Sequence, residues 1–307
     1  DLENPKTSGD GIFFVNTSHE PTTEQVNELK IMSMQALDHN LPGAVVGIGG
    51  GSTLDIAKAV SNLLTNPGNA EDYQGWNLVK NPGVYKIGVP TLSGTGAEAS
   101  RTCVMTNYKK NLKLGMNSPF TVYDHLILDP ELTATVPRNQ FFYSSMDTYI
   151  HCVESLKGSY RHILADSYSK DALEMVRKVM LEDDMLTADN RALVMAASFL
   201  GGTAIGNSYV GIVHPFSAGL SMVFGTHHCE ANCIVMANMQ EFYPQETAEF
   251  LTMVKRQKID IKRNVCANCT DEDFDRLYQS TIVHEVPLKN ALGENFREIL
   301  TKDKVIE

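Results

Sequence analysis

The sequence predicts an α/β fold in which a domain built on a parallel sheet is followed by an all-helical domain. Two observations lead to this prediction. Before Pro137, short apolar runs that suit buried strands alternate with amphipathic helical segments, and such alternation is typical of a parallel sheet covered by helices. After Pro137 the pattern is helical almost throughout. We therefore expect two domains, 1–136 and 137–307.

The elements expected in the first domain follow from apolar runs and helix-start signals. A helix over 22–39 begins at Thr22, whose spacing to Gln25 fits a capping box. A second helix, over 52–64, carries an apolar face. The expected strands cover 12–15, 44–48, 85–89, 103–106 and 126–128. The chain begins at Asp1 with the polar stretch DLENPKTSGDG, and we expect natural sequence to precede it.

The second domain is expected to consist of helices, because its apolar residues recur at helical spacing. These helices cover 138–157, 165–180, 187–206, 213–223, 229–240, 246–257, 271–283 and 294–300. Hydrophobic residues make up 43% of the chain and charged residues 21%, which is the composition of an ordinary globular protein.

Charge and cysteine usage limit the partners of the chain. It carries 26 basic and 37 acidic residues, a net charge of −11, which argues against nucleic acid and against a membrane as partners. A small anionic substrate stays compatible, because it responds to the local field. The cysteines show no framework spacing, so we expect reduced thiols in a cytoplasmic protein. Cys266 and Cys269 have the C-x-x-C spacing without a second pair, which favours a surface loop or packed cysteines over a metal or redox site.

Two glycine-rich loops follow predicted strands. The first is Gly49-Gly50-Gly51-Ser52, and the second is Thr91-Leu92-Ser93-Gly94-Thr95-Gly96. We expect each loop to open a helix, whose free N–H groups suit an anion that approaches the glycine backbone. Two such loops at successive strand ends suit a nucleotide pyrophosphate. The alternative is a pair of tight turns with no ligand.

One carboxylate and three imidazoles form the strongest candidate site. Asp147 and His151 are four residues apart in a helical segment and therefore share one helix face. His214 and His228 flank a mostly apolar segment, where unpaired imidazoles are unfavourable. Such a set suits one divalent transition metal, and imidazole ligands suit iron(II) and zinc alike. The alternative for Asp147 and His151 is a hydrogen bond on the helix surface.

These motifs resemble the iron-containing (group III) alcohol dehydrogenase family. The resemblance runs from about Ala44 to Asn238 and rests on five segments in order. They are GGGSTLDIAKAV, PTLSGTGAEAS, ILDPELTATVP, MDTYIHCVES and VHPFSAGLS followed by THHCEAN. The resemblance implies a Rossmann-like dinucleotide-binding domain followed by a helical metal-binding domain, the dehydroquinate synthase-like architecture. It also implies a metal-dependent oxidoreductase that acts on an alcohol, with NAD(P) as the usual electron acceptor.

The resemblance also implies roles for individual residues. The metal ligands would be Asp147, His151, His214 and His228. The residues that bind the cofactor would be Gly49, Gly50, Gly51, Ser52, Asp55, Thr91, Ser93, Gly94, Thr95 and Lys113, the last at the ribose side.

The sequence departs from the family pattern at two positions. Ala218 replaces a second histidine that usually lies four residues after the third ligand, and His227 replaces a common proline. His227 is therefore a candidate general base; the alternative is that it faces solvent. The absence of the second histidine is similar to a branch whose members oxidise the C8 primary alcohol of 3-deoxy-D-manno-octulosonate in lipopolysaccharide sugar synthesis.

From these arguments we expect oxidation of a primary alcohol of a sugar acid to an aldehyde, with NAD(P) or oxygen as the acceptor. One alternative is an NAD(P)-dependent alcohol or polyol dehydrogenase of the same family. Another is a catalytically idle metal-binding or sugar-binding protein that lost its proton relay at Ala218. A homodimer is compatible with the sequence, which does not fix the assembly.

Overall fold

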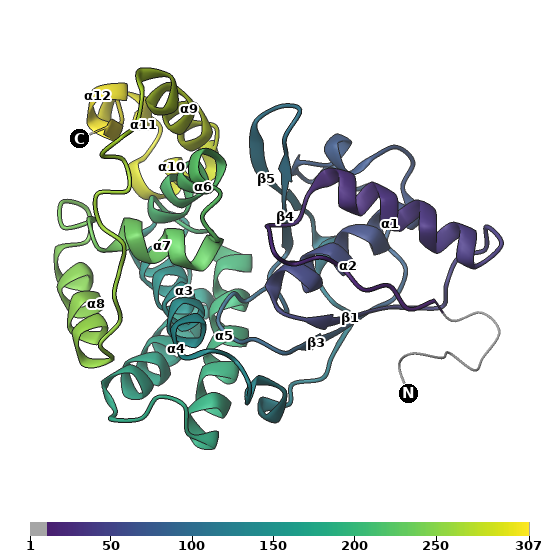
Figure 1. Ribbon diagram of the computed structural model, residues 1–307, viewed down its shortest axis with the longest axis horizontal. Coiled ribbons are helices and arrows are strands. Elements are labelled where there is room, and N and C mark those ends of the chain that lie inside the picture. Colours follow the sequence, from purple (N-terminus) through teal and green to yellow (C-terminus); the bar gives the residue numbers. More distant parts are fainter. Residues whose placement is uncertain (1–10, 307) are drawn as a thin grey trace. The chain divides into compact units, whose positions relative to one another are not determined.

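The computed structural model describes residues 11–306 and divides into two compact units (Figure 1). The first, here called the α/β unit, comprises Asp1–Thr91 and Ser100–Leu128. The second, the helical unit, comprises Leu92–Ala99 and Asp129–Glu307. The stretch DLENPKTSGD at the start of the chain lies outside the described residues. The predicted class, a parallel sheet with helices followed by a helical domain, is confirmed.

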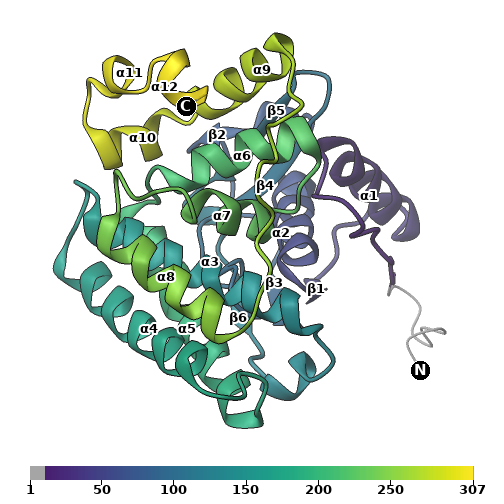
Figure 2. The ribbon, with the colours of Figure 1, turned by 60° about the vertical axis from the view of Figure 1, so that its left-hand side comes forward.

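A parallel three-stranded sheet carries the α/β unit. Strands β1 (Val45–Gly49), β3 (Lys86–Pro90) and β6 (His125–Leu126) pair in the order β1-β3-β6. Helix α2 (Gly51–Thr65) begins directly after β1 and packs on that strand, and α1 (Thr23–Ala36) packs on α2. Figure 2 shows β1 beside β3. These elements match the predicted ones to within a few residues at each end.

The N-terminus of α1 has one of the two hydrogen bonds of the predicted capping box. The Thr22 hydroxyl accepts a hydrogen bond from the Gln25 backbone N–H at 3.0 Å. The Gln25 side chain does not complete the capping box; it donates to the backbone carbonyl of Asn16 at 3.0 Å.

A second, mixed sheet in the α/β unit was only partly predicted. Over residues 11–306 it consists of β2 (Gly75–Trp76), β5 (Leu112–Asn117) and β4 (Thr102–Asn107), with β5 in the centre. β4 and β5 form an antiparallel hairpin, while β2 runs parallel to β5. The short 3-10 helices η1 (Ala70–Asp72) and η2 (Pro119–Thr121) flank this sheet in sequence.

The strand predicted over 12–15 is wrong. These residues form no strand, and Phe13 and Val15 instead pack against the apolar core of the α/β unit. Contact with this core therefore accounts for two residues of the hydrophobic run, while Ile12 and Phe14 are exposed.

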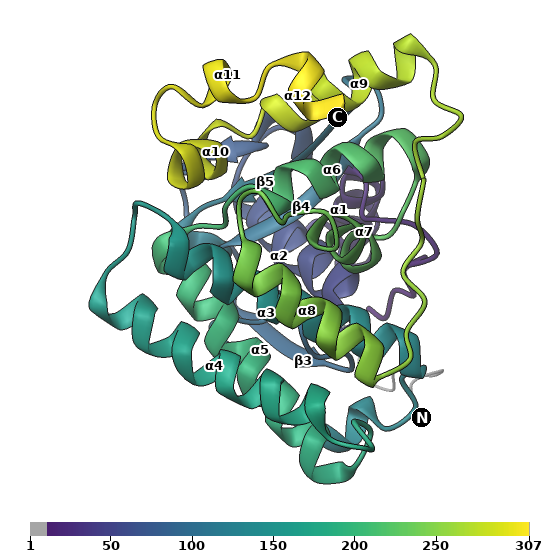
Figure 3. The ribbon, with the colours of Figure 1, turned by 90° about the vertical axis from the view of Figure 1, so that its left-hand side faces the viewer.

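The helical unit is built around one nearly buried helix. Helix α3 spans Arg138–Lys157, as predicted, and every residue from Phe141 to Ser155 except Tyr143 is buried. The helices that follow are α4 (Ile163–Leu181), α5 (Ala188–Ser208), α6 (Val213–Phe224), α7 (His228–Met236), α8 (Pro244–Arg256), α9 (Asp271–Ile282), α10 (Glu285–Leu292), α11 (Phe296–Ile299) and α12 (Lys302–Ile306). In Figure 3, α4 and α5 run side by side, and both pack on α3.

Two helix predictions need correction in this unit. The helix expected over 229–240 ends at Met236, because the chain turns at Ala237 and Asn238. The helix expected over 294–300 is shortened to α11, and α10 and α12, which were not predicted, lie on either side of it. Gly293, whose φ is 82°, ends α10.

The domain boundary lies earlier than the sequence suggests. The 3-10 helix η3 (Pro130–Thr133) packs on α5, so the helical unit already includes residues from Asp129 onward instead of starting at Pro137. Leu92–Ala99 also belongs to the helical unit although it is flanked in sequence by strands of the α/β unit. A single boundary at residue 136 therefore does not separate Leu92–Ala99 from the α/β unit.

In the part of the chain that the structure describes, no single helix is long and apolar enough to cross a membrane. Helices α5 and α6 meet the length and composition criterion only as a pair, and that pair is bent by 103°.

Candidate metal centre

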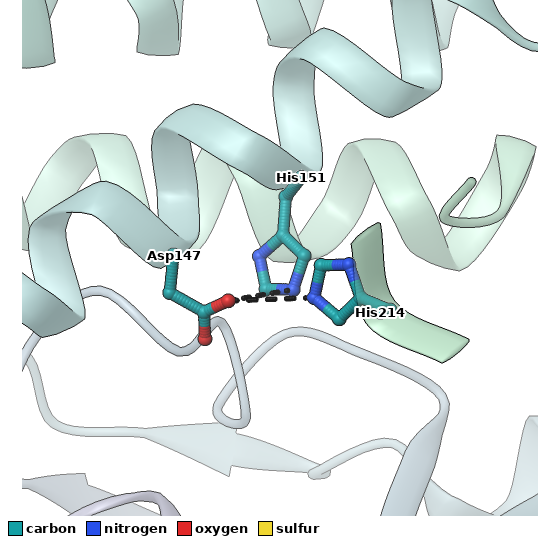
Figure 4. Close-up of side chains that lie close together, drawn as sticks. All are labelled: Asp147, His151 and His214. Carbon is teal, nitrogen blue, oxygen red and sulfur yellow. Dashed lines mark ion pairs between the residues drawn. The ribbon is translucent and has the colours of Figure 1, made fainter. Parts of the chain in front are cut away.

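The four residues predicted as metal ligands come from three helices of the helical unit. Asp147 and His151 lie one turn apart on α3, where both side chains are buried. His214 is the second residue of α6, and His228 is the first residue of α7. Figure 4 shows Asp147 and His151 pointing from one helix toward His214. The helix periodicity of α3 and the start of α6 thus bring these three side chains together.

The distances between the ligand atoms suit one tetrahedral ion. Oδ1 of Asp147 lies 3.6 Å from Nε2 of His151 and 3.4 Å from Nε2 of His214. Oδ2 of the same carboxylate lies 3.6 Å from Nε2 of His228. Bonds of about 2.1 Å in a tetrahedral site place neighbouring ligand atoms about 3.4 Å apart. The separations of Asp147 from His151 and His214 fit this geometry, and the ligand atoms of these three residues form a group that could hold a metal ion. His228 lies outside this group and approaches the other oxygen of the Asp147 carboxylate.

The amide of Asn232 lies between three of the four predicted ligands. Its Nδ2 donates to Oδ1 of Asp147 at 2.6 Å and lies 3.3 Å from Nε2 of His214 and 3.2 Å from Nε2 of His228. One small polar group is therefore within hydrogen-bonding distance of three of the four predicted ligands. Sequence reasoning missed Asn232, although it lies four residues after His228 on α7 and hence on the same helix face.

A second carboxylate supports His214 from the other side of its ring. Glu154 is fully buried on α3, and its Oε2 lies 2.5 Å from Nδ1 of His214. Its Oε1 accepts a hydrogen bond from the backbone N–H of Val213 at 2.5 Å. Glu154 was also missed, although it lies seven residues after Asp147, two turns along the same helix face.

Burial and mutual charge set the protonation of the centre. Burial would raise the pKa of Asp147, but the imidazoles of His151, His228 and His214 hold it below its usual range. Burial lowers the pKa of His151 to about 4. Burial would also lower the pKa of His214, but the carboxylates of Glu154 and Asp147 raise it to about 9. At neutral pH the metal-free centre thus has a neutral His151 and a protonated His214.

This protonation pattern predicts that metal uptake depends on pH. A metal must displace the proton of His214, whose pKa is about 9, so each ion bound below that pH should release about one proton. Apparent affinity should rise about tenfold per pH unit up to about pH 9 and then level off, while His151 contributes nothing in this range. Without metal, the raised pKa of His214 stabilises the fold below pH 6.5, and this contribution is lost as the pH rises through 9.

Competition with a metal-chelating dye at pH 7, 8 and 9 measures the metal affinity. Calorimetry in buffers of different ionisation enthalpy measures the number of protons released per ion. An affinity that does not change between pH 7 and 9 would contradict the prediction.

The two residues that depart from the resembled family pattern lie in α6 and at the N-terminus of α7. Ala218 is buried on α6. His227 is exposed and occupies the N-cap position of α7, with its backbone carbonyl accepting from the N–H of Ala231 at 2.9 Å. The role of His227 as a base stays a prediction.

The first glycine-rich loop has the geometry expected of a strand-to-helix turn. Gly49 ends β1 with φ 159°, Gly50 is the N-cap of α2, and Gly51 and Ser52 form its first turn. No acidic residue and no side-chain cap occupies this end of α2. The expected helix start is therefore present, and its first-turn N–H groups are not capped by a side chain of the N-cap residue.

The second loop does not open a helix. Thr91 follows β3 and donates its backbone N–H to the Gly49 carbonyl at 2.9 Å, so the two loops begin side by side in the α/β unit. The residues after Gly96 form only a turn before β4, which contradicts the predicted helix start. Ser93 is buried, and its Oγ has no hydrogen-bond partner among the described residues.

The glycines of this second loop serve packing inside the helical unit. A Cβ atom at Gly94 would lie 1.9 Å from the carbonyl oxygen of Ser144 on α3, and the Gly94 carbonyl accepts from the Thr148 hydroxyl at 2.7 Å. Thr95 is half-buried between Gly94 and Gly96. The loop thus binds Thr148, the residue that directly follows the predicted ligand Asp147 on α3.

Two charged residues predicted at the cofactor are engaged within the α/β unit. The Asp55 carboxylate lies 3.1 Å from Nζ of the buried Lys58 and accepts from the Val104 backbone N–H at 2.9 Å. Lys113, buried on β5, forms an ion pair with Glu20 at 3.3 Å. In this arrangement both side chains stabilise the unit that contains them.

Comparison with known proteins assigns the chain to a family. Residues 6–130 match the family described as iron-containing alcohol dehydrogenase, and residues 141–291 match the C-terminal region of the Fe-containing alcohol dehydrogenase family. These segments cover most of the sequence, so the chain belongs to the iron-containing alcohol dehydrogenase family.

Individual relatives within the family act on different compounds. The chain is 35% identical over 178 residues to a sulfoacetaldehyde reductase of Bilophila wadsworthia (strain 3_1_6). The matched segment covers 57% of this chain and 46% of the relative. The chain is also 27% identical over 238 residues to an NAD-dependent methanol dehydrogenase of Bacillus methanolicus. Here the matched segment covers 76% of this chain and 61% of the relative. The chain thus spans about half the length of these curated relatives.

Solved structures of the family share the fold. A sulfoacetaldehyde reductase from Bifidobacterium kashiwanohense in complex with NAD+ superposes with a TM-score of 0.76 at 22% identity, over 95% of this chain and 81% of that one. An iron-containing alcohol dehydrogenase superposes with a TM-score of 0.78 at 23% identity, over 95% and 80% of the two chains.

Proposed function

We propose that the protein is a metal-dependent oxidoreductase that interconverts an alcohol and its aldehyde. The observation that carries this proposal is the convergence of Asp147, His151 and His214 at spacings that suit one divalent ion, with His228 beside the same carboxylate. When bound there, iron(II) or zinc would supply Lewis-acid chemistry to an alcohol or carbonyl oxygen. Membership of the iron-containing family favours iron.

The protein's own residues would hold the ion and handle the substrate proton. The buried carboxylate of Asp147 and the neutral imidazole of His151 provide ligand atoms that need no deprotonation at neutral pH. Oxidation of an alcohol must also release the hydroxyl proton, and Ala218 carries no group that could accept it. We therefore propose His227, which precedes the ligand His228, as the base.

The proposed electron acceptor is NAD(P). Its pyrophosphate would lie at the N-terminus of α2, where Gly49, Gly50 and Gly51 allow close approach and the helix end favours an anion. This places Ser52 in the first helical turn, within reach of the same phosphates. Oxygen as an acceptor is the alternative.

The dinucleotide proposal predicts that a side chain at Gly50 weakens binding. A valine at this N-cap position would cover the first-turn N–H groups of α2, and we expect NAD or NADP affinity to fall by more than about tenfold, since each lost hydrogen bond to a charged group costs about 1.5–3 kcal/mol. Titration followed by calorimetry measures the change. Gly43→Val is the matched control, because a Cβ atom at Gly43 meets no atom within 4 Å. Equal affinity in the two variants would contradict the proposed role of this loop.

The proposed substrate is a primary alcohol of a sugar acid, with C8 of 3-deoxy-D-manno-octulosonate as the specific candidate. Ala218 in place of a histidine supports it, and sulfoacetaldehyde, named in two relatives, is likewise an anion. A simple alcohol or polyol is the alternative substrate class. A protein that only binds metal or sugar, without turnover, is the second alternative.

A substrate screen separates these candidates. The metal-loaded protein is incubated with sugar acids, simple alcohols, polyols and sulfoacetaldehyde, and NAD(P)H and hydrogen peroxide are read separately. Turnover of the sugar acid alone supports the specific proposal, whereas turnover of simple alcohols with NAD(P) supports the alternative. Absence of turnover with every compound would favour the binding protein. His227→Ala should lower kcat at unchanged metal content, and near-normal kcat would reject its role as the base.

A further inference from the structure

We propose that Glu154 is a positioning residue that holds His214 in the tautomer and orientation required for metal binding. The proposal rests on the metal site proposed above but concerns a residue that binds no metal. Glu154 is completely buried, and both of its carboxylate oxygens have a partner: Nδ1 of His214 and the backbone N–H of Val213.

The hydrogen bond to the ring selects one tautomer. An ionised carboxylate accepts hydrogen bonds and donates none, so Nδ1 of His214 must carry the hydrogen. Nε2 is then the nitrogen whose lone pair is available to a metal, and it lies 3.4 Å from Oδ1 of Asp147. Support of a metal-binding histidine by a carboxylate on its other nitrogen fixes the ring plane as well as the tautomer.

The second hydrogen bond fixes the backbone that carries the ring. Val213 is the first residue of α6, and its N–H has no partner within that helix. Glu154 accepts this N–H at 2.5 Å and also places a negative charge at the N-terminus of α6, where the helix dipole favours it. One carboxylate on α3 therefore orients both the side chain and the helix end that present His214.

Nearby packing leaves little room for another arrangement of Glu154. A Cβ atom at Gly211 would lie 3.2 Å from Cβ and Cγ of Glu154, so the turn before α6 lies directly against its stem. We therefore expect Glu154 to keep this position, so that a change in its carboxylate acts on its two hydrogen-bond partners.

Glutamine at position 154 tests this inference with almost no change of shape. An amide offers one acceptor oxygen and one donor nitrogen, but two donors face it, the N–H of Val213 and Nδ1–H of His214. If the oxygen accepts from Val213, the amide nitrogen faces Nδ1 of His214. This favours the tautomer with hydrogen on Nε2, so that Nε2 has no lone pair for the metal. If it accepts from His214, a buried N–H loses its partner. We expect zinc affinity of Glu154→Gln to fall about 10–100-fold.

The measurement is competition of zinc with a chelating dye at a fixed pH, without substrate or cofactor. In parallel, nitrogen-15 NMR of the zinc-loaded protein reports whether Nδ1 of His214 carries the hydrogen. Glu249→Gln is the matched control. Glu249 lies on α8, accepts from the Tyr149 hydroxyl and from Arg177 in the same unit, and contacts none of the ligands. The Glu249→Gln variant should bind zinc with the affinity of the wild type.

Glu154→Asp covers the case in which the glutamine variant fails to fold. It keeps the charge, but a side chain shorter by one methylene cannot reach both partners, so its zinc affinity should also fall. Affinity within about threefold of wild type in either folded variant, a difference of about 0.65 kcal/mol, would overturn the proposal. Failure of the wild type itself to bind zinc or iron would instead overturn the proposed metal site, on which this inference depends.

Discussion

Replacing His214 by alanine should abolish metal binding and destabilise the metal-free protein, whereas replacing His228 should abolish metal binding alone. Each substitution removes one predicted ligand, and its effect on metal affinity should exceed the 10–100-fold that is typical when a supporting residue is lost. The two variants differ in what they leave behind. His214→Ala removes the ring that lies 2.5 Å from the fully buried Glu154, while the His228 side chain is 29% exposed.

The expected cost to stability follows from the buried charge. Removing one partner of a buried charged pair typically costs about 3–5 kcal/mol, because the remaining charge stays buried without compensation. We expect a cost of this order for His214→Ala in the metal-free protein at neutral pH, where His214 is protonated. His228→Ala should change the free energy of unfolding much less.

Metal content by mass spectrometry and unfolding in denaturant measure the two effects. His125→Ala is the control, because His125 is an exposed residue on β6 in the α/β unit and should affect neither quantity. Wild-type metal content in either His214→Ala or His228→Ala would contradict the proposed ligand set. Equal stability of the two variants would contradict the account of Glu154 as a buried charge that depends on His214.

The clustering of Asp147, His151 and His214 could be predicted from the sequence because its signals are largely local. Asp147 and His151 are four residues apart on one helix, and the helix itself was predicted with its observed bounds. Glu154 and Asn232 share helices with predicted ligands, but their importance arises from partners on other helices. A single sequence shows that such residues lie on the right face and leaves open what they contact.

The limits of the fold prediction have a similar origin. β5 was missed because LKLGMN contains a lysine and a glycine and lacks a β-branched residue, so its strand character depends on pairing with β4 and β2. The loop after β3 was predicted to open a helix because its glycines resemble those after β1. In the structure these glycines serve close contacts with α3 and α5, which a local pattern does not reveal.

Those contacts lead to a second prediction with a large effect, in which Gly96→Ala destabilises the helical unit far more than Gly225→Ala. Both glycines adopt the left-handed conformation, with φ of 63° and 65°. An alanine at either position therefore incurs the same backbone strain, about 1–2 kcal/mol. A Cβ atom at Gly225 meets nothing within 4 Å, whereas one at Gly96 would lie 2.6 Å from Cα of Gly202 on α5. The difference between the two variants thus isolates the packing of the loop on α5.

The reciprocal substitution removes backbone strain from the comparison altogether. Gly202 lies inside α5, where alanine normally stabilises a helix by about 0.5–1 kcal/mol. Here its Cβ atom would lie 2.5 Å from the Gly96 carbonyl oxygen and 2.8 Å from the Gly96 Cα. Because both neighbours are backbone atoms, the loop or the helix must shift, and overpacking of this kind typically costs about 1–3 kcal/mol. We expect Gly96→Ala to cost about 2–5 kcal/mol in total and Gly202→Ala to be destabilising despite its favourable helix propensity.

Unfolding in denaturant measures the stability of Gly96→Ala, Gly202→Ala and Gly225→Ala. A stabilising Gly202→Ala, or equal losses for Gly96→Ala and Gly225→Ala, would show that the loop does not pack on α5 in this way.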